Sequence, residues 1–250
     1  MSVKKFKKYL YKLLSFLTFG KLKEFFENKF AKYGNCNLSI DIKGVNNSFD
    51  IEVIKKLGIN LSIYGDNNEI SINKDAVVNN NVSIIIHGSN NKINIEQIII
   101  GQQLRIIMGF PTCKTKNSSI IIKKKTRFVN TEIMLLEEES TLNIGEDCLF
   151  SENVLVHLSD THSIFDLDGN LINYGGNVKI GNRVWVGRDV RILKKALISD
   201  DSVVGGSAIV TGKFLEPHCI IAGNPAKIVK RGVRWSCNPP QYSKNLINEK

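Results

Sequence analysis

The strongest constraint on the fold of this chain is a series of aliphatic residues spaced six apart in its C-terminal half. A small residue lies four positions after each of the first five members, and the interval continues upstream. A period of six fits neither an α-helix nor a flat sheet, but it fits a strand and a corner repeated as the walls of a prism. The aliphatic side chain then points inward and the small residue fills the corner. The aliphatic series is Ile180, Val186, Ile192, Ile198, Val204 and Val210; the small series is Val184, Val190, Ala196, Ser202 and Ala208; upstream lie Ile144, Phe150 and Val156, with Cys148 and Val154 at the small position.

A second kind of repeat occupies the preceding region. The stretch GVNNSFDIE begins at residue 44, GDNNEISIN at residue 65 and GSNNKINIE at residue 88. Glycine followed by paired asparagines favours positive φ angles and sharp turns, while alternating isoleucines favour half-buried strands. Each unit is therefore interpreted as one coil of a solenoid. Further on, we expect FPTCKTKNSS to form a loop and SSIIIKKKTRF to contain a strand.

The C-terminal stretch VKIGNRVWVGRDVRILKKALISDDSVVGGSAIVTGKFLEPHCIIAGNPAKIV resembles the hexapeptide-repeat acyltransferases. The resemblance is greatest to the capsular and lipopolysaccharide O-acetyltransferases. It covers residues 142–232, and residues 34–141 are similar only in their coil-like character. It implies an all-β fold, the left-handed parallel β-helix, whose handedness rests on the resemblance because crossover preferences alone favour a right-handed connection.

The resemblance also implies an activity and an assembly. The expected enzyme is an acetyl-CoA-dependent O-acetyltransferase that modifies a sugar hydroxyl of a capsular, lipopolysaccharide or other surface glycan, without a metal. The expected assembly is a homotrimer with active sites between adjacent prisms. Fold does not fix chemistry, so two alternatives stay open: an N-acetyltransferase acting on a nucleotide sugar or other small amine, and a non-catalytic scaffold that binds glycan.

We expect the chain to divide into four parts. These are a basic amphipathic helical arm at residues 1–32, irregular N-terminal coils at 33–141, a regular acetyltransferase β-helix at 142–232 with an inserted loop at 160–177, and a C-terminal tail at 233–250. The arm carries nine lysines against two glutamates and so supplies +7 of the net charge of +10. Because the remaining charge is nearly balanced, nucleic-acid binding is not expected.

The arm has the pattern of an amphipathic helix that ends at Gly20. Its apolar stretch is far shorter than the roughly 20 residues that span a bilayer. Two interpretations remain: a helix lying on an anionic membrane face, or a helix packed on the rest of the protein or on a neighbouring subunit. The apolar positions are Phe6, Tyr9, Leu10, Leu13, Leu14 and Leu17, followed by a second short face of Leu22, Phe25, Phe26 and Phe30.

The five cysteines are far apart and form no CxxC pair. This distribution argues against both a disulfide framework and a zinc knuckle. It favours a reducing compartment, and we expect the protein to be cytoplasmic, with a peripheral contact at the inner face of the membrane if the arm binds lipid.

The stretch SDTHSIFDLDGNLINYGG interrupts the repeats and has the composition of a loop that leaves the prism wall. Transfer of an acetyl group to a hydroxyl needs a base, and histidine is suited to this role at neutral pH. His162 is the candidate, and the resemblance implies the same role because the matching histidine of the family's D-x-H-S-I segment is the base. Either Asp160 or Asp166 would orient its ring. The alternative is an ordinary solvated loop histidine.

Trp185 is expected to face outward from a wall strand. In related sialic acid O-acetyltransferases the matching tryptophan helps to form the site, where its indole could donate a hydrogen bond or stack on a sugar. The resemblance would let Trp185 come from the neighbouring subunit. The alternative is a tryptophan that covers a subunit contact.

Two C-terminal turns are expected to bind the coenzyme. Glycines allow close backbone approach, which a pantetheine arm requires, and basic side chains suit the phosphates. The alternative is that the glycines serve only corner geometry and that the basic residues are simply solvated. The candidates are Gly205, Gly206, Ser207, Lys213, Ala222, Gly223, Asn224, Lys227 and Arg231.

A zinc hydratase like the γ-class carbonic anhydrases is a rival interpretation. His157 and His162 have the five-residue spacing of two of its metal ligands. A third ligand is needed, and the run NSSIIIKKK lies where it would be expected. His157 is therefore interpreted as a lining or packed residue, and no metal site is expected.

Overall fold

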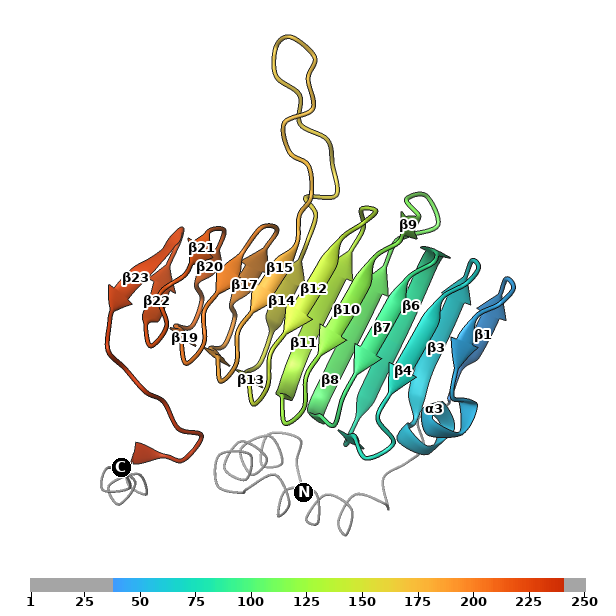
Figure 1. The fold of residues 1–250 in the computed structure, drawn as a ribbon, viewed down its shortest axis with the longest axis horizontal. Helices are drawn as coiled ribbons and strands as arrows, with labels where there is room; N and C mark the ends of the chain where they lie inside the picture. Colours follow the sequence, from blue (N-terminus) through green and yellow to red (C-terminus); the bar gives the residue numbers. More distant parts are fainter. Residues whose placement is uncertain (1–37, 241–250) are drawn as a thin grey trace, which may run out of the picture. The chain divides into compact units, whose positions relative to one another are not determined.

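The computed structural model describes residues 38–240, and the expected arm and most of the expected tail lie outside this range. Of the described residues, 38–233 belong to one compact unit and 234–240 belong to a second unit. In the first unit, parallel strands stack coil upon coil into three walls around a continuous apolar core (Figure 1). No helix within residues 38–240 is both long and apolar enough to cross a membrane.

The chain visits the three walls in the order I, II and III in each complete coil. Long strands turn the corner from wall I into wall II: the start of β8 pairs with β5 on wall I and the rest pairs with β6 on wall II. Strand β11 does the same between β13 and β14. Wall I contains β5 (Val77–Val78), the starts of β8 (Ile99–Met108) and β11 (Arg127–Leu135), β13 (Leu149–Phe150), β16 (Trp185–Val186), β19 (Val203–Val204) and β22 (Ile220–Gly223).

Wall II adds β1 (Ile40–Lys43), β3 (Ile59–Tyr64), β6 (Asn81–Ser89), β14 (Val154–His157), β17 (Arg191–Leu193) and β20 (Ile209–Val210) to β8 and β11. Wall III is the eight-stranded sheet of β2 (Ser48–Phe49), β4 (Glu69–Ile72), β7 (Lys92–Ile95), β10 (Ser119–Ile122), β12 (Thr141–Ile144), β15 (Val178–Ile180), β18 (Leu197–Ile198) and β21 (Lys213–Phe214). Strand β9 (Thr115–Lys116) pairs with the end of β6, within the stretch expected to be only a loop. Strand β23 (Ala226–Lys230) runs antiparallel to β22 at the C-terminal end.

Every member of the six-residue series is buried, as predicted. Ile180 pairs with Ile198, so three intervals of six make one coil. At seven corners of the regular coils a residue with positive φ directly precedes the buried small residue, which turns the chain within a very short span. These positive-φ residues are Asp147, Asn153, Arg183, Asp189, Lys195, Asp201 and Ser207.

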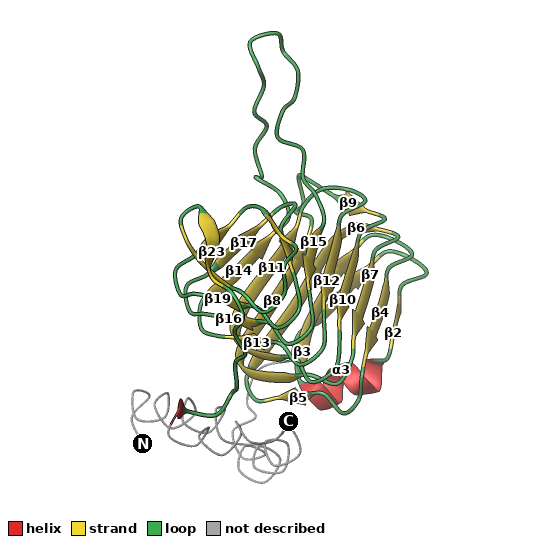
Figure 2. Cartoon of the chain, turned by 60° about the vertical axis from the view of Figure 1, so that its left-hand side comes forward, coloured by secondary structure: helices red, strands yellow, loops and turns green. Residues whose placement is uncertain are grey.

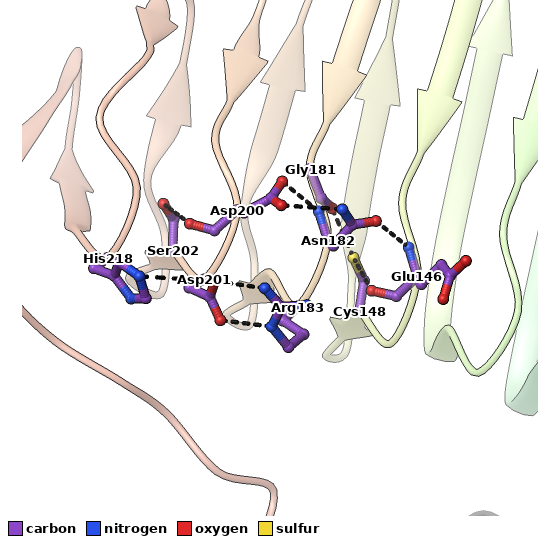
Figure 3. Close-up of polar contacts among 9 residues, drawn as sticks. All are labelled: Glu146, Cys148, Gly181, Asn182, Arg183, Asp200, Asp201, Ser202 and His218. Carbon is purple, nitrogen blue, oxygen red and sulfur yellow. Dashed lines mark hydrogen bonds and ion pairs between the residues drawn. The ribbon is translucent and has the colours of Figure 1, made fainter. Parts of the chain in front are cut away.

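Side-chain ladders join successive corners between walls III and I (Figure 3). Asn182 Oδ1 accepts from the Glu146 backbone N–H at 2.9 Å, and Asp200 Oδ1 accepts from the Asn182 backbone N–H at 2.8 Å. Beside them, Asp201 accepts two hydrogen bonds of 2.7 Å from the Arg183 guanidinium. Each coil therefore supplies hydrogen-bond acceptors to the coil before it.

The N-terminal coils turn from wall II to wall III in a different way. Gly44, Gly65 and Gly88 have φ angles of 129°, 147° and 150°, and each lies against the next coil. The second asparagine of each pair then joins a ladder through the coils: Asn47 Oδ1 accepts from the Asn68 backbone N–H at 3.0 Å, and Asn68 Oδ1 accepts from the Asn91 backbone N–H at 3.1 Å. The predicted coils at residues 44, 65 and 88 are confirmed.

One helix, α3 (Ile51–Leu57), was not expected from the repeats. It follows β2, at the place in the coil where later coils have a wall I strand. Asp50 caps its N-terminus by accepting from the Glu52 and Val53 backbone N–H groups, and Gly58 ends it with a φ of 64°. The capping residues were present in the sequence, but the seven-residue helix is too short to show a clear helical period.

Candidate active site

The longest departure from the prism is the segment between β14 and β15, which projects from the corner between walls II and III (Figures 1 and 2). One coil later, residues 194–196 alone connect β17 to β18 at this corner. The insertion adds the length of one coil, because Leu149 pairs with Trp185 across 36 residues while Trp185 pairs with Val203 across 18. The predicted loop therefore leaves the prism after wall II and returns to it at wall III.

Glu137 fixes the base of this loop from the preceding coil. Its carboxylate accepts from Ser159 Oγ at 2.7 Å on the outgoing limb and from the Gly175 backbone N–H at 2.7 Å on the returning limb. A Cβ atom on Gly175 would lie 2.7 Å from the Glu137 carboxyl carbon, so a larger residue here would displace this carboxylate. Both limbs are thus held at one carboxylate.

Lys194 fixes the loop from the following coil. Its ammonium donates to Asp160 Oδ2 and, at 2.7 Å, to the backbone carbonyl of Asn173. The Lys194 hydrogen bond holds the pKa of the Asp160 carboxyl below its ordinary value, against the opposing effect of burial. Asp160 is therefore ionised at neutral pH and bound to a cation.

His162 lies on the outgoing limb just beyond this point and is exposed. Its backbone carbonyl accepts from Asn173 Nδ2 at 2.8 Å. Within residues 38–240 the imidazole ring itself has no hydrogen-bond partner. The ring is thus open to an incoming acceptor hydroxyl, as a base requires.

Neither candidate orienting acid contacts the His162 ring by a hydrogen bond in the described chain. Asp160 binds Lys194 and Asn173, while Asp166 accepts from the Asn170 backbone N–H at 2.8 Å and closes the tip of the loop. Hydrogen bonds from Asn170 lower the pKa of Asp166. The orienting role of Asp160 or Asp166 stays a prediction.

The outer part of the loop is unusually apolar for an exposed segment. Phe165 is 59% exposed, and Leu167 at the tip is fully exposed. Clusters of exposed large apolar side chains commonly mark an interaction surface. The exposed apolar side chains of the loop are Ile164, Phe165, Leu167, Ile172 and Tyr174.

Trp185 lies on wall I and is 38% exposed, as expected for an outward position. Its indole N–H donates to Ser151 Oγ at 3.2 Å, so the ring leans toward the corner between walls I and II. His162 belongs to the corner between walls II and III. Within one chain these two residues therefore occupy different corners of the prism.

Beside Trp185, residues with small or absent side chains follow one another from coil to coil. The backbone N–H of Ser151 donates to the carbonyl oxygen of Val186 in the next coil. The backbone N–H groups of Gly187 and Gly205 likewise each donate to a carbonyl oxygen one coil further on. A Cβ on Gly187 would lie 2.7 Å from the Val204 carbonyl oxygen, and one on Gly205 would lie 3.1 Å from Ala222 Cβ. We call Ser151, Gly187, Gly205 and Ala222 the small-residue column.

The structure brings only some of the predicted coenzyme residues together. Gly205, Gly206 and Ser207 lie at the corner next to Ala222 and Gly223, and Lys227 pairs with Ala222. Asn224 follows in the turn between β22 and β23. Lys213 lies on wall III, and Arg231 binds Glu216 at 2.9 Å. The column and Lys227 form one cluster, which Lys213 does not join.

His157 faces a carboxylate instead of a second histidine. Its Nε2 lies 3.4 Å from Glu132 Oε1 on wall II, and Glu132 also accepts from Arg105 at 3.1 Å. Among residues 38–240 no group of three or more histidine, cysteine or acidic side chains is arranged to hold a metal ion. His157 is thus a wall residue, as the sequence indicated.

Sequence reasoning missed four residues of this region. Glu137 and Lys194 lie one coil before and after the loop, and their role depends on coil stacking, which local sequence does not reveal. Gly187 could have been found, because it lies 18 residues before Gly205 in the regular repeat. Asn173 lies within the loop, where no periodicity guides interpretation.

Known proteins with similar sequences and structures are acetyltransferases. A polysialic acid O-acetyltransferase of Neisseria meningitidis is 34% identical over 213 residues, covering 83% of this chain and 95% of that protein. Another, of Escherichia coli O1:K1, is 35% identical over 123 residues, covering 49% of this chain but only 39% of that protein. The structure of the polysialic acid O-acetyltransferase OatWY matches with a TM-score of 0.62 and 28% identity, covering 84% of this chain and 98% of that one.

These likenesses confirm the left-handed parallel β-helix that was expected from the repeats and the resemblance. No model of a known protein family matches the chain.

Proposed function

The chain belongs to the hexapeptide-repeat O-acetyltransferases, and from this premise we propose that it transfers the acetyl group of acetyl-CoA to a hydroxyl of a surface glycan. The observation that carries the proposal is the placement of His162. Its imidazole is exposed and free of hydrogen bonds to the described residues, on a loop whose base is fixed by two neighbouring coils. A catalytic base needs both this access and this support.

The reaction follows from the position of the imidazole. His162 takes the proton of the acceptor hydroxyl while the hydroxyl oxygen attacks the thioester carbonyl carbon. The tetrahedral intermediate collapses, the carbon–sulfur bond breaks, and the imidazolium returns the proton to the departing thiolate. His162 thus ends the cycle in its starting form.

The small-residue column suits the pantetheine arm of the coenzyme. Gly206 supports this assignment. The nearest atom to a Cβ built there would be the Arg188 carbonyl oxygen at 3.3 Å, a contact that a small shift would relieve, so packing within the chain is a weaker reason for a glycine here than at Gly187. Lys227 pairs with Ala222 of the column and would bind the coenzyme phosphates. Arg231 would have to leave Glu216 to do so, and Lys213 would act only from a separate wall.

We propose a homotrimer because each chain carries two halves of the site on different corners. The loop with His162 would lie against the wall I surface of a neighbouring subunit, near its Trp185. Wall I offers an apolar outward face there, with Leu149, Trp185 and Val203 in register. The exposed apolar tip of the loop needs such a surface. Light scattering of the purified full chain tests the assembly, and a monomer at assay concentration would contradict it.

We propose a surface glycan such as polysialic acid as the acceptor, because two relatives are named polysialic acid O-acetyltransferases. Thiol release from acetyl-CoA across a panel of glycans, with mass spectrometry of the products, tests this. Acetylation of an amine would favour the N-acetyltransferase alternative. Glycan binding without thiol release would favour the scaffold.

We place the enzyme in the cytoplasm, with residues 1–32 as the candidate contact to the inner membrane face. The lysine-rich amphipathic pattern of this segment supports the contact. Deletion of residues 1–32 should then shift the protein from the membrane pellet to the supernatant. Unchanged sedimentation would exclude the membrane contact.

The decisive test of the catalytic role is His162→Ala, which should lower the rate of thiol release by at least about 100-fold. His218→Ala is the matched control, because His218 lies at another corner, 3.9 Å from Asp201. The control should keep the wild-type rate. A His162→Ala variant with normal acetyl transfer would contradict the proposed function.

A further inference from the structure

We infer that Asn173 is a positioning residue for His162, an inference that rests on the function proposed above. Asn173 lies on the returning limb of the loop, opposite the segment that carries the histidine. Its side-chain amide forms hydrogen bonds on both sides of Ser163. Nδ2 donates to the His162 carbonyl at 2.8 Å, and Oδ1 accepts from the Ile164 backbone N–H at 2.8 Å.

The amide takes the place of a peptide group in the loop hairpin. Beyond this point the two limbs pair through their backbones, since the Ile172 N–H donates to the Ile164 carbonyl at 2.9 Å and Phe165 forms an antiparallel bridge with Leu171. Nearer the prism the limbs are joined through the Asn173 side chain, which offers one donor and one acceptor in the geometry of a peptide. The hairpin is thereby extended to the His162 carbonyl.

This contact fixes the backbone from which the imidazole projects. Because the carbonyl of His162 and the N–H of Ile164 are both fixed, the peptide units on either side of Ser163 are held in place. The Cα–Cβ bond of His162 then has a set direction even though its ring makes no hydrogen bond within the described chain. A ring without a bonded orienting acid needs another source of order, and the backbone supplies it.

The contact is also tied to the rigid part of the molecule. Asn173 Nδ2 donates to Asp160 Oδ2 at 3.0 Å, and the Asn173 carbonyl accepts from Lys194 at 2.7 Å. Lys194 belongs to the short corner after β17. The backbone that carries His162 is therefore anchored, through Asn173 and Lys194, to the next coil. Catalytic groups lose rate steeply when displaced by about 1 Å.

The test compares Asn173→Ala with Asn170→Ala, a control of the same residue type at the tip of the same loop. Asn170 binds Asp166 and, within residues 38–240, forms no hydrogen bond to residues 162–164. Asn173→Ala should lower kcat by about 10- to 100-fold and leave the KM for acetyl-CoA within about 2-fold. Asn170→Ala should change both by less than about 2-fold. Equal effects of the two substitutions would overturn the inference.

A double-mutant comparison separates positioning from a general structural role. In the His162→Ala background, adding Asn173→Ala should change the residual rate by less than about 2-fold, because the histidine it positions is gone. A further loss as large as in the wild-type background would show that Asn173 acts elsewhere. If Asn173→Ala does not fold, Asn173→Asp serves instead, since it keeps an acceptor for the Ile164 N–H and loses the Nδ2 donor to the His162 carbonyl and to Asp160.

Failure of the inference and failure of the proposed function give different results. Full activity of His162→Ala would remove the base assignment whatever Asn173 does. An inactive His162→Ala together with an unaffected Asn173→Ala would remove only the positioning role.

Discussion

The corner between walls II and III is built in two ways in this chain. In the N-terminal coils a glycine and two asparagines make the turn, and the buried Asn68 and Asn91 bond from one coil to the next. In the regular C-terminal coils, residues 194–196 make the turn with one positive-φ lysine and the buried Ala196. The first kind of turn is held by side-chain hydrogen bonds to residues about one coil away. The second kind of turn does not use such a side-chain ladder among the described residues.

The difference explains where an insertion is possible. The amide ladder weakens toward the C-terminus, because Asn91 Oδ1 accepts from the Ser118 N–H and the Ser118 hydroxyl then accepts from the Ser140 N–H. In the following coil the loop leaves at this same corner. A ladder that needs a side chain from every coil would not allow that departure, but a locally satisfied corner does. The candidate site lies where the first kind of corner gives way to the second.

The largest expected effect comes from Gly88→Ala. A Cβ there would lie 1.8 Å from the Thr115 carbonyl oxygen, at a φ of 150°. We expect the free energy of unfolding to fall by more than about 3 kcal/mol, measured by urea denaturation. Gly58→Ala is the control, because it has positive φ but nothing within 4 Å, and it should cost about 1 kcal/mol. Equal costs would mean that close coil approach does not define the N-terminal corners.

The buried ladder should matter more than the exposed one beside it. Asn91→Ala removes the acceptor of the Ser118 N–H and a donor to Asn68, leaving buried polar groups unpaired. We expect a loss of about 2 to 3 kcal/mol in the free energy of unfolding. Asn90→Ala removes an exposed side-chain bond to Asn117 and one from Asn67 and places an alanine at a φ of 58°, and should cost about 1 kcal/mol. A reversed order of the two losses would contradict the ladder.

In the C-terminal coils, Gly206→Ala should separate folding from binding. Its Cβ would meet only the Arg188 carbonyl at 3.3 Å, so we expect a change below about 1 kcal/mol in stability. If the coenzyme passes this corner, the KM for acetyl-CoA should rise at least about 5-fold, as steady-state kinetics would show. Gly212→Ala, with Phe214 Cε2 4.0 Å away, is the control and should leave KM unchanged. An unchanged KM for both variants would exclude Gly206 from the coenzyme site.

The smallest expected effect concerns pH. Asp160 has a lowered pKa in the folded chain, so its bond to Lys194 contributes stability above the unfolded pKa of about 3.9 and is lost only as pH falls through the lower folded value. The rate of limited proteolysis within the loop should therefore be constant between about pH 8 and pH 5. Faster cleavage near pH 6 would show that another group controls the base of the loop.

The sequence predicted the regular coils well because their signal is periodic. Ile192 and Val210 are buried partners one coil apart, and the glycine–asparagine turns were also found. The helix α3 and the short β9 were missed, since each is too short to show a period. The division of the prism at residues 141 and 142 stays a prediction, and β10 pairs with β12 across it.

The candidate site was only partly predictable. His162 could be proposed from its chemistry and from the resemblance, but Glu137 and Lys194 approach it from other coils. Their roles depend on which residues stack, and an 18-residue insertion hides that register from inspection of the sequence. The separation of His162 and Trp185 on different corners likewise appears only when the walls are built.

The reversed strand β23 has a consequence for the solubility of the molecule. A stack of parallel coils ends in an open edge, and such an edge is a template on which further chains can add, as in a growing fibre. On wall I that edge is occupied by β23, which runs in the opposite direction. Lys227 and Lys230 on this strand are both exposed. Another molecule that presents a parallel coil would meet mismatched hydrogen-bond spacing and positive charge on this wall, which disfavours its addition there.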